Sequence, residues 1–302
     1  MAQVSRANHT VPQFYLRGFA KQVRDKALVG VVRRPGKVRY LQNVAKVSVI
    51  NDFYTVNGAP QLDVIEKLIA DEFEAPAAEV FRQVLIDRVW PLSEEDRTIL
   101  SSFLALQHAR GAHKRQALNE IAGTIASGLE DGSGFDTAAS DWPDKLKAAH
   151  IKSMLNFEET GARFFLRPWT LVRFVRKRLL SCDAPISLRP FPDAPAGSAV
   201  GIGTAGMILF PMSRTTGLVM SGRLIETENE AREIASGQFD SVAAGSTAAA
   251  NDLNNATIQN ARNSIYHHPE DAALVPQHLE EPQAQEVLTD DPFPGEEDRE
   301  DG

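Results

Sequence analysis

In this 302-residue sequence, three residues are candidates for the catalytic chemistry of hydrolysis or phosphoryl transfer: His9, Arg110 and Asp183. A histidine titrates near neutral pH, so it can transfer a proton or bind a metal ion. A carboxylate and a cation beside it would complete the side chains needed for a hydrolytic or phosphoryl-transfer site. We therefore treat these three as candidate catalytic residues. They lie in separate segments of the chain, so only the fold can bring them together.

Other polar residues are candidates for binding a ligand or a metal ion. Gln107 and Arg110 are three residues apart, which places them on one face of a helix. Glu66 and Glu72 lie in an acidic helix and, together with a histidine, could hold a divalent cation. The candidate ligand-binding residues are Gln13, Arg17, Tyr54, Gln107 and Asn254.

Each candidate also has a structural explanation. A lone histidine near a terminus commonly satisfies a buried carbonyl group or caps a turn. Asp183 lies two residues before Pro185, where an aspartate can accept a hydrogen bond from its own backbone. Gln107 and Arg110 can pair with the glutamates of the acidic helix. Whether the candidates share one site stays open at this point.

A nucleic-acid partner is suggested by RFFLRPWTLVRFVRKR, residues 163–178, where six basic residues alternate with four aromatic ones. Basic side chains contact phosphates, and exposed aromatic rings stack on bases. The alternative is an ordinary solvated face, because alternation in a strand turns the aromatic rings inward and the arginines outward. The candidate phosphate contacts are Arg163, Arg167, Arg173, Arg176, Lys177 and Arg178.

Hydrophobic patterning predicts an α+β fold with small antiparallel sheets packed against several long helices. A hairpin is expected to turn at Pro35-Gly36, and a third strand should end at Asn57-Gly58. Ser93 should cap the second part of a helical region that Pro91 interrupts. The expected ranges are β structure over 27–56, helix over 61–128, a surface loop over 128–144, helix over 145–166, strands over 169–174, 178–188 and 201–220, and helix over 246–266.

Charge is distributed unevenly along the chain. The net charge is -8, but residues 269–302 contain twelve acidic residues and one basic residue, a net charge of -11, which leaves +3 for the rest. A segment this polar buries too little apolar surface to offset its ordering entropy. We therefore expect a single domain over residues 1–268 and a disordered acidic tail over 269–302. That tail would act as a solubilising extension or dock on a basic surface.

Composition and motifs narrow the class of protein. The one cysteine, Cys182, excludes an intrachain disulfide and fits a reducing compartment. No apolar stretch approaches the roughly 20 residues needed to span a bilayer, and no secretion signal is visible, so the cytoplasm is the expected location. The sequence contains no G-x-x-x-x-G-K-[ST] loop and no G-x-S-x-G elbow. GIGTAG, residues 201–206, precedes an expected strand and not the helix that a dinucleotide site needs.

Several stretches, taken in order, give the chain a family resemblance: NHTVPQFYLRGFA (8–20), NDFYT (51–55), IEKLIADEFEAPAAEVF (65–81), FLALQHARGAHKR (103–115), SCDAPI (181–186) and NNATIQNARNSIY (254–266). With these motifs it resembles a bacterial family of proteins of unknown function, number 4238 in the domain-of-unknown-function series, over residues 8–266. Two positions depart from the family pattern. Gly111-Ala112 replace Thr-Pro, and Ser181-Cys182-Asp183-Ala184-Pro185 replaces Ser-Asp-Asn-Pro, with a cysteine before the aspartate and an alanine after it, so any ligand contact made by that asparagine is missing here. The resemblance implies which residues matter and no particular reaction.

Two functional hypotheses follow. The first is an intracellular enzyme, a metal-assisted hydrolase that acts on a phosphate-bearing or nucleic-acid substrate with a divalent cation. The second is a non-catalytic ligand-binding or regulatory module whose polar cluster holds the fold or a ligand. An open pocket lined by His9, Arg110 and Asp183 would favour the enzyme, whereas burial and mutual hydrogen bonding would favour the module. In both cases the first segment should anchor in the core through Val11, Phe14, Leu16 and Phe19.

Overall fold

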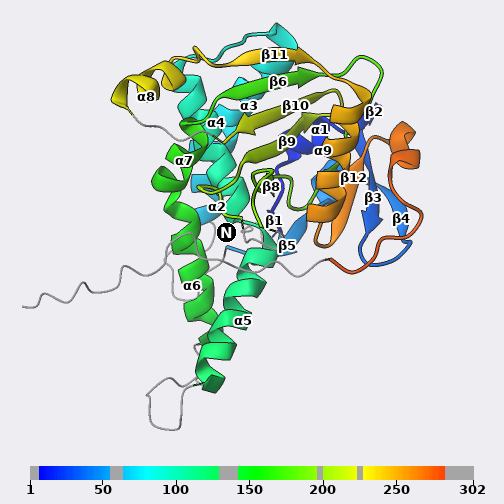
Figure 1. The fold of residues 1–302 in the computed structure, drawn as a ribbon. Coiled ribbons are helices and arrows are strands. Elements are labelled where there is room, and N and C mark those ends of the chain that lie inside the picture. The colour runs from blue at the N-terminus through cyan, green and yellow to red at the C-terminus, as the bar shows by residue number, and fades with distance from the viewer. Residues whose placement is uncertain (1–6, 55–63, 129–141, 196–199, 223–226, 283–302) are drawn as a thin grey trace, which may run out of the picture.

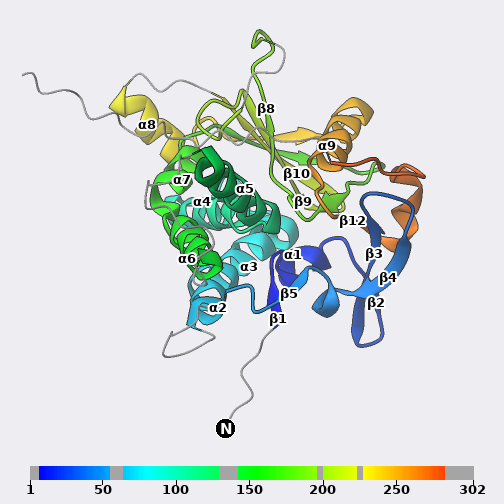
Figure 2. The ribbon, with the colours of Figure 1, turned by 90° about the horizontal axis from the view of Figure 1, so that it is seen from below.

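The computed structural model describes residues 7–54, 64–128, 142–195, 200–222 and 227–282. Its helices and mostly antiparallel sheets confirm the α+β class. Figures 1 and 2 show helices α2–α7 gathered on one side of the molecule and the sheet that contains β3 and β12 on the other. In Figure 1, α5 and α6 extend together away from the larger sheet. No helix within the described residues is long and apolar enough to cross a membrane.

The larger sheet has the strand order β11–β6–β10–β9–β8. Neighbouring strands are antiparallel, except that β11 runs parallel to β6. Its central strands are apolar runs: in β9 every residue after Met207 is buried. The sheet therefore forms one wall of the main core. Its strands are β6 (Trp169–Arg173), β8 (Ser187–Arg189), β9 (Met207–Ser213), β10 (Thr216–Ser221) and β11 (Ser241–Ala244).

The second sheet has the order β2–β3–β12–β7, and β4 pairs with β3 along the other edge. The hairpin of β3 and β4 confirms the predicted turn, in which Gly36 has a φ of +115°. A small third sheet joins β1 to β5. The strands are β1 (Ala7–His9), β2 (Lys21–Val23), β3 (Lys26–Arg33), β4 (Arg39–Asn43), β5 (Val49–Asn51), β7 (Ser181–Cys182) and β12 (Ser264–His267).

Three predicted strand or helix boundaries were wrong. The third strand, β5, ends at Asn51 and pairs with β1, and the expected end at Asn57-Gly58 lies outside the described residues. The range 178–188 holds two short strands that belong to different sheets, β7 and β8. The last helix ends at Asn260, and the residues up to Tyr266 turn into β12, because Asp183 accepts the backbone N–H groups that follow the helix. Local patterning does not contain these long-range pairings.

The helices follow the predicted regions but divide more often. Ser93 caps α4 as expected, since its hydroxyl accepts the N–H of Asp96 at 3.1 Å. The predicted long helix breaks at Arg110-Gly111, the helix over 145–166 breaks at Asn156, and α8 was not predicted. The helices are α1 (Gln13–Arg17), α2 (Val64–Ile69), α3 (Ala75–Arg82), α4 (Glu94–Ala109), α5 (Ala112–Gly128), α6 (Trp142–Leu155), α7 (Phe157–Phe165), α8 (Glu228–Ala235) and α9 (Thr247–Asn260), with π-helical segments at Ala70–Glu74 and Gln83–Asp87 and 3-10 turns at Val44–Lys46 and Pro269–Leu274. The expected loop over 128–144 lies mostly outside the described residues.

The segment that was expected to start the tail packs on the body. Residues 269–282, which we call the C-terminal strap, bury Val275 and Leu279. Leu279 exchanges two backbone hydrogen bonds with Gly36, at 2.8 and 3.0 Å. Arg214 forms an ion pair with Asp271 at 2.6 Å. The predicted boundary at Pro269 was therefore too early, because these few apolar residues and specific pairs outweigh the acidic composition. Residues 283–302 lie outside the described part of the chain.

We expect truncation after His268 to lower the melting temperature by roughly 5–15 °C relative to truncation after Pro282. The shorter chain loses two buried aliphatic side chains, worth about 1.5–3 kcal/mol each, and the hydrogen bonds of the strap. Thermal unfolding of the two truncated proteins, followed by circular dichroism, measures the difference. Equal melting temperatures would show that the strap does not stabilise the body.

Candidate functional site

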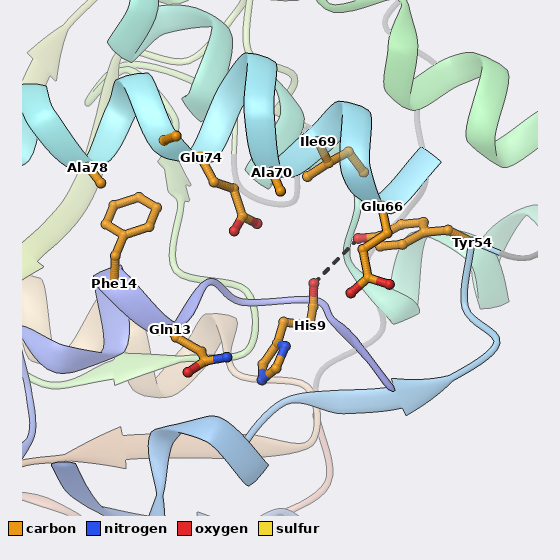
Figure 3. A pocket seen from close by; sticks show the side chains of 10 residues that line it. His9, Gln13, Phe14, Tyr54, Glu66, Ile69, Ala70, Glu74 and Ala78 are labelled. Atoms are coloured by element: carbon orange, nitrogen blue, oxygen red, sulfur yellow. Dashed lines mark hydrogen bonds between the residues drawn. The ribbon is translucent and has the colours of Figure 1, made fainter. Parts of the chain in front are cut away.

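A pocket lies between the N-terminal segment (residues 8–20) and the helical run that follows Val64. We call residues 64–82, which comprise α2, the first π-helical segment and α3, the pocket helix. Figure 3 shows the carboxylates of Glu66 and Glu74 reaching from this helix toward the N-terminal segment. The pocket has a volume of about 350 Å³ and is lined by His9, Gln13, Phe14, Tyr54, Glu66, Ile69, Ala70, Glu74, Ala75 and Ala78.

Four lining residues of the pocket helix recur at intervals of four: Glu66, Ala70, Glu74 and Ala78. An α-helix has about 3.6 residues per turn, so residues four apart drift around its axis. The π-helical turn from Ala70 to Glu74 closes i→i+5 hydrogen bonds and is wider, which keeps these residues closer to one line. Such π turns inside α-helices are frequent at functional sites.

Asn8 ties together three parts of the site. It is buried in β1, opposite Ile50 of β5. Its Oδ1 accepts the backbone N–H of Tyr54 at 3.2 Å, and its Nδ2 donates to Glu66 Oε2 at 2.5 Å. One amide therefore fixes the N-terminal segment, the wall residue Tyr54 and a carboxylate of the pocket helix relative to one another.

His9 lies on the wall opposite the two glutamates, and its ring lies beside the Gln13 side chain (Figure 3). Burial lowers the pKa of His9 and outweighs the hydrogen bond to the Ala45 backbone and the charge of Glu74, which both raise it. The ring is therefore neutral at pH 7. Its Nε2 atom is buried and has no hydrogen-bond partner among the described residues. A buried polar atom of this kind requires an explanation, such as a bound water or ligand that completes the site.

Arg110 is buried behind the pocket and does not line it. Its Nη1 donates to Glu74 Oε1 at 2.7 Å, and its Nε and Nη2 donate to Gln107 Oε1 at 2.9 and 2.6 Å. Gln107 in turn donates to the carbonyl oxygen of Thr10 at 3.2 Å. These contacts hold the guanidinium in place, so Arg110 positions Glu74 and the N-terminal segment and does not reach toward a ligand.

Two polar groups of the pocket keep hydrogen-bonding capacity. Glu74 accepts from Arg110 through Oε1, while its Oε2 has no donor in the described part of the chain. The Gln13 side chain also makes no hydrogen bond there. The Tyr54 hydroxyl donates to the carbonyl oxygen of His9 at 3.5 Å, and burial raises its pKa, so it stays protonated. The pocket therefore presents a carboxylate oxygen and an amide whose bonding is incomplete.

The family model described as "Protein of unknown function (DUF4238)" matches residues 7–271. The chain belongs to the DUF4238 family. This match confirms the resemblance that the sequence motifs indicated. It covers both walls of the pocket, from the N-terminal segment to the pocket helix. No curated protein and no solved structure matches the chain.

The two C-terminal DUF4238 motifs, which contain Asp183 and Asn254, contact each other. Asp183 therefore does not line the pocket. The Asp183 carboxylate accepts the backbone N–H groups of Arg262 and Asn263 at 2.9 and 2.8 Å. Asn254 holds the preceding strand: its Oδ1 accepts the N–H of Leu180 at 2.9 Å. Asp183 and Asn254 thus join α9 and β12 to the turn around β7. Asp183 was expected in the catalytic set, but these contacts make it a backbone anchor.

Two further candidates of the DUF4238 chain point away from the pocket. Arg17 and Glu72 are exposed, and neither lines it. Glu72 was predicted as a metal ligand, whereas Glu74, which lies eight residues after Glu66 and lines the pocket, was missed. Within the described residues, no three histidine, cysteine, aspartate or glutamate side chains converge as metal ligands. The expected group of His9, Glu66 and Glu72 is therefore not formed.

Three of the four aromatic residues in the stretch over 163–178 turn inward. Phe164, Trp169 and Phe174 are buried, so their rings cannot stack on bases. Arg167 is also buried and donates hydrogen bonds to three backbone carbonyl groups, so it cannot contact a phosphate. Apart from the buried Arg167, the ordinary alternative describes this stretch of the DUF4238 chain: most aromatic rings lie in the core, and Arg176 and Lys177 are exposed.

Proposed function

We propose that this protein is a ligand-binding module whose pocket takes a small organic molecule with a positively charged nitrogen. The observation that carries the proposal is Glu74, which lines the pocket and keeps one carboxylate oxygen without a donor in the described part of the chain. Its partner Arg110 satisfies the other oxygen from behind. A fixed acceptor aimed at a cavity is the arrangement that recognises a donor on a ligand.

The charge of the lining supports a cationic ligand. Among the described residues, the lining contains two glutamates and neither lysine nor arginine, and His9 is neutral at pH 7. Arg110 offsets part of that charge from behind Glu74. A cavity lined by one sign of charge attracts the opposite sign and repels its own. An ammonium, amidinium or guanidinium group would therefore be preferred over a phosphate.

The apolar part of the lining sets the shape of the ligand. Phe14 and Ile69 supply apolar surface, and Ala70, Ala75 and Ala78 leave space because their side chains are small. Pockets for small molecules combine mostly apolar walls with a few placed polar groups. A volume of about 350 Å³ lies at the lower end of the range for such pockets, which suits a compact ligand with one apolar group.

The metal-assisted hydrolase has less support. It requires His9, Arg110 and Asp183 in one site, but Arg110 is buried behind Glu74 and Asp183 anchors backbone elsewhere. Two carboxylates facing the cavity would also oppose a phosphate-bearing substrate. A binding role uses the polar cluster as it stands, in part to hold the fold and in part to meet the ligand.

We also propose that the chain forms a single domain and that the protein is located in the cytoplasm. One apolar cluster contains buried residues from Val11 to Tyr266, which supports a single domain. A second cluster packs Val275 and Leu279 of the C-terminal strap against Val32 and Ile265, which supports including the strap in that domain. The single cysteine, Cys182, is buried and unpaired, which suits a reducing compartment.

We expect benzamidinium to bind, its neutral isostere benzamide to bind at least about tenfold more weakly, and benzoate not to bind. Isothermal titration calorimetry at pH 7 and low ionic strength measures all three. Glu74→Gln keeps the size and an acceptor for Arg110 but removes the charge, so it should lose most of the preference for benzamidinium. Glu72→Gln, which removes an exposed carboxylate of the same pocket helix that does not line the pocket, serves as the matched control and should bind as the native protein does. Tighter binding of benzoate, or an unchanged preference in Glu74→Gln, would refute the proposal.

A further inference from the structure

Arg115, in the first turn of α5, carries a partly buried positive charge without a carboxylate partner in the described part of the chain. Its guanidinium lies over the ring of Phe53, 3.7 Å from the centroid. Its Nε and Nη2 both donate to Nδ1 of His150, at 3.2 and 3.1 Å. Burial lowers the pKa of Arg115 to about 10, and the Tyr54 hydroxyl is the group that acts in the opposite direction.

The partners of Arg115 orient it without neutralising it. Because His150 accepts at Nδ1, its Nε2 carries the proton and donates to the carbonyl oxygen of Ala109 at 3.0 Å. Burial and the charge of Arg115 lower the pKa of His150 to about 4, so the ring is neutral at pH 7. Phe53 and His150 therefore fix the guanidinium plane, while the Nη1 amino group and the second N–H of Nη2 keep no acceptor among the described residues.

Lys147 places a second cation nearby, because it contacts Asp52, the neighbour of Phe53, and lies three residues before His150 on α6. Its Nζ donates to the backbone carbonyl of Asp52 at 2.6 Å. Burial lowers the pKa of Lys147, the charge of Arg115 lowers it further, and the carboxylates of Asp144 and Asp52 act in the opposite direction. Two cations near each other repel, and an anion between them would relieve that repulsion.

The three arginines that are buried within the described residues, Arg97, Arg110 and Arg167, are satisfied in ways that Arg115 is not. Arg97 pairs with Asp240, and Arg110 pairs with Glu74. Arg167 has no carboxylate, but each of its three nitrogens donates to a backbone carbonyl group. Arg115 has one neutral nitrogen as its acceptor within the described residues. Arg97, Arg110 and Arg167 are therefore structural residues, whereas Arg115 keeps N–H donors that have no acceptor within the described residues.

We propose that Arg115 and Lys147 bind an oxyanion, the phosphate or carboxylate group of a small molecule, at a site separate from the pocket. The planar guanidinium offers paired donors that match an oxyanion, and its fixed orientation lowers the entropy lost on binding. The N-terminal end of α5 adds positive potential in its first turn. Both side chains are partly exposed, so an ion can reach them from solvent.

The test is a titration of the full-length protein with sodium phosphate and, separately, sodium acetate, against sodium chloride at matched ionic strength. Chemical shifts of Arg115 Nε and the His150 ring report binding at the site. We expect saturable shifts with one of the two oxyanions, which identifies the phosphate or carboxylate class. Arg115→Gln should weaken binding about tenfold or more, and Lys147→Gln should weaken it less.

Arg82→Gln is the matched control, because Arg82 is an exposed arginine paired with Glu79. It should leave the affinity unchanged. A response that sodium chloride reproduces, no saturable shift with either oxyanion, or equal affinity in Arg115→Gln would overturn the site. If Arg115→Gln does not fold, Lys147→Gln and the Arg115 Nε shift of the native protein decide between the same outcomes.

Discussion

Removal of residues 1–20 is expected to abolish folding. Val11, Tyr15, Leu16 and Phe19 are almost fully buried in the main core. At about 1.5–3 kcal/mol for each large apolar side chain, their loss costs roughly 6–12 kcal/mol, which is as large as the whole stability of a typical domain, about 5–15 kcal/mol. Far-ultraviolet circular dichroism and thermal unfolding of the truncated protein measure the effect.

A pair of adjacent point variants makes the same prediction without truncation. Leu16 is fully buried, whereas its neighbour Arg17 is exposed on the same helix, α1. Leu16→Ala should lower the free energy of unfolding by about 2–5 kcal/mol, and Arg17→Ala should change it by no more than about 0.5 kcal/mol. A cooperatively folded protein without residues 1–20, or equal effects of the two variants, would contradict the anchoring role.

The second large effect is expected from Asp240→Asn. Asp240 and Arg97 form a fully buried ion pair at 2.5 Å. Burial raises the pKa of Asp240 and lowers the pKa of Arg97, so each charge depends on the other to remain in the core. Replacing the carboxylate by an amide leaves Arg97 charged and unpaired, which costs about 3–5 kcal/mol.

Urea unfolding of Asp240→Asn at pH 7 measures this cost. Glu228→Gln is the control, because Glu228 pairs with Arg232 on the exposed surface of α8 at 3.0 Å. An exposed pair of this kind is worth about 0–1 kcal/mol, so the control should unfold near the native midpoint. A loss for Asp240→Asn as small as that of the control would show that Arg97 is held by its other contacts, the Trp169 ring and the carbonyl oxygen of Phe165.

Local signals in the sequence predicted the local parts of the fold. The Pro35-Gly36 hairpin and the Ser93 cap depend on residues within a few positions of each other, and both are confirmed. The partner of β5 and the turn from α9 into β12 depend on contacts between distant segments. The C-terminal strap was missed for a similar reason: composition reports its charge but not the two aliphatic residues that pack.

The candidate site was predicted in part. His9, Gln13, Tyr54 and Glu66 line the pocket, because the N-terminal segment and the pocket helix lie against each other. Glu74 was missed because the π-helical turn that aligns it with Glu66 has no known signature in the residue types. Asp183 has the right chemistry for a catalytic site, but its position depends on the pairing of β7 with β12, which one sequence does not reveal.

The claim that this pocket binds a cationic ligand is tested most directly by a crystal structure of the protein with benzamidinium at saturating concentration. The predicted result is an amidinium nitrogen within about 2.7–3.2 Å of Glu74 Oε2, with the ring against Phe14. An empty pocket at saturation, or benzamidinium bound at another surface, would contradict it.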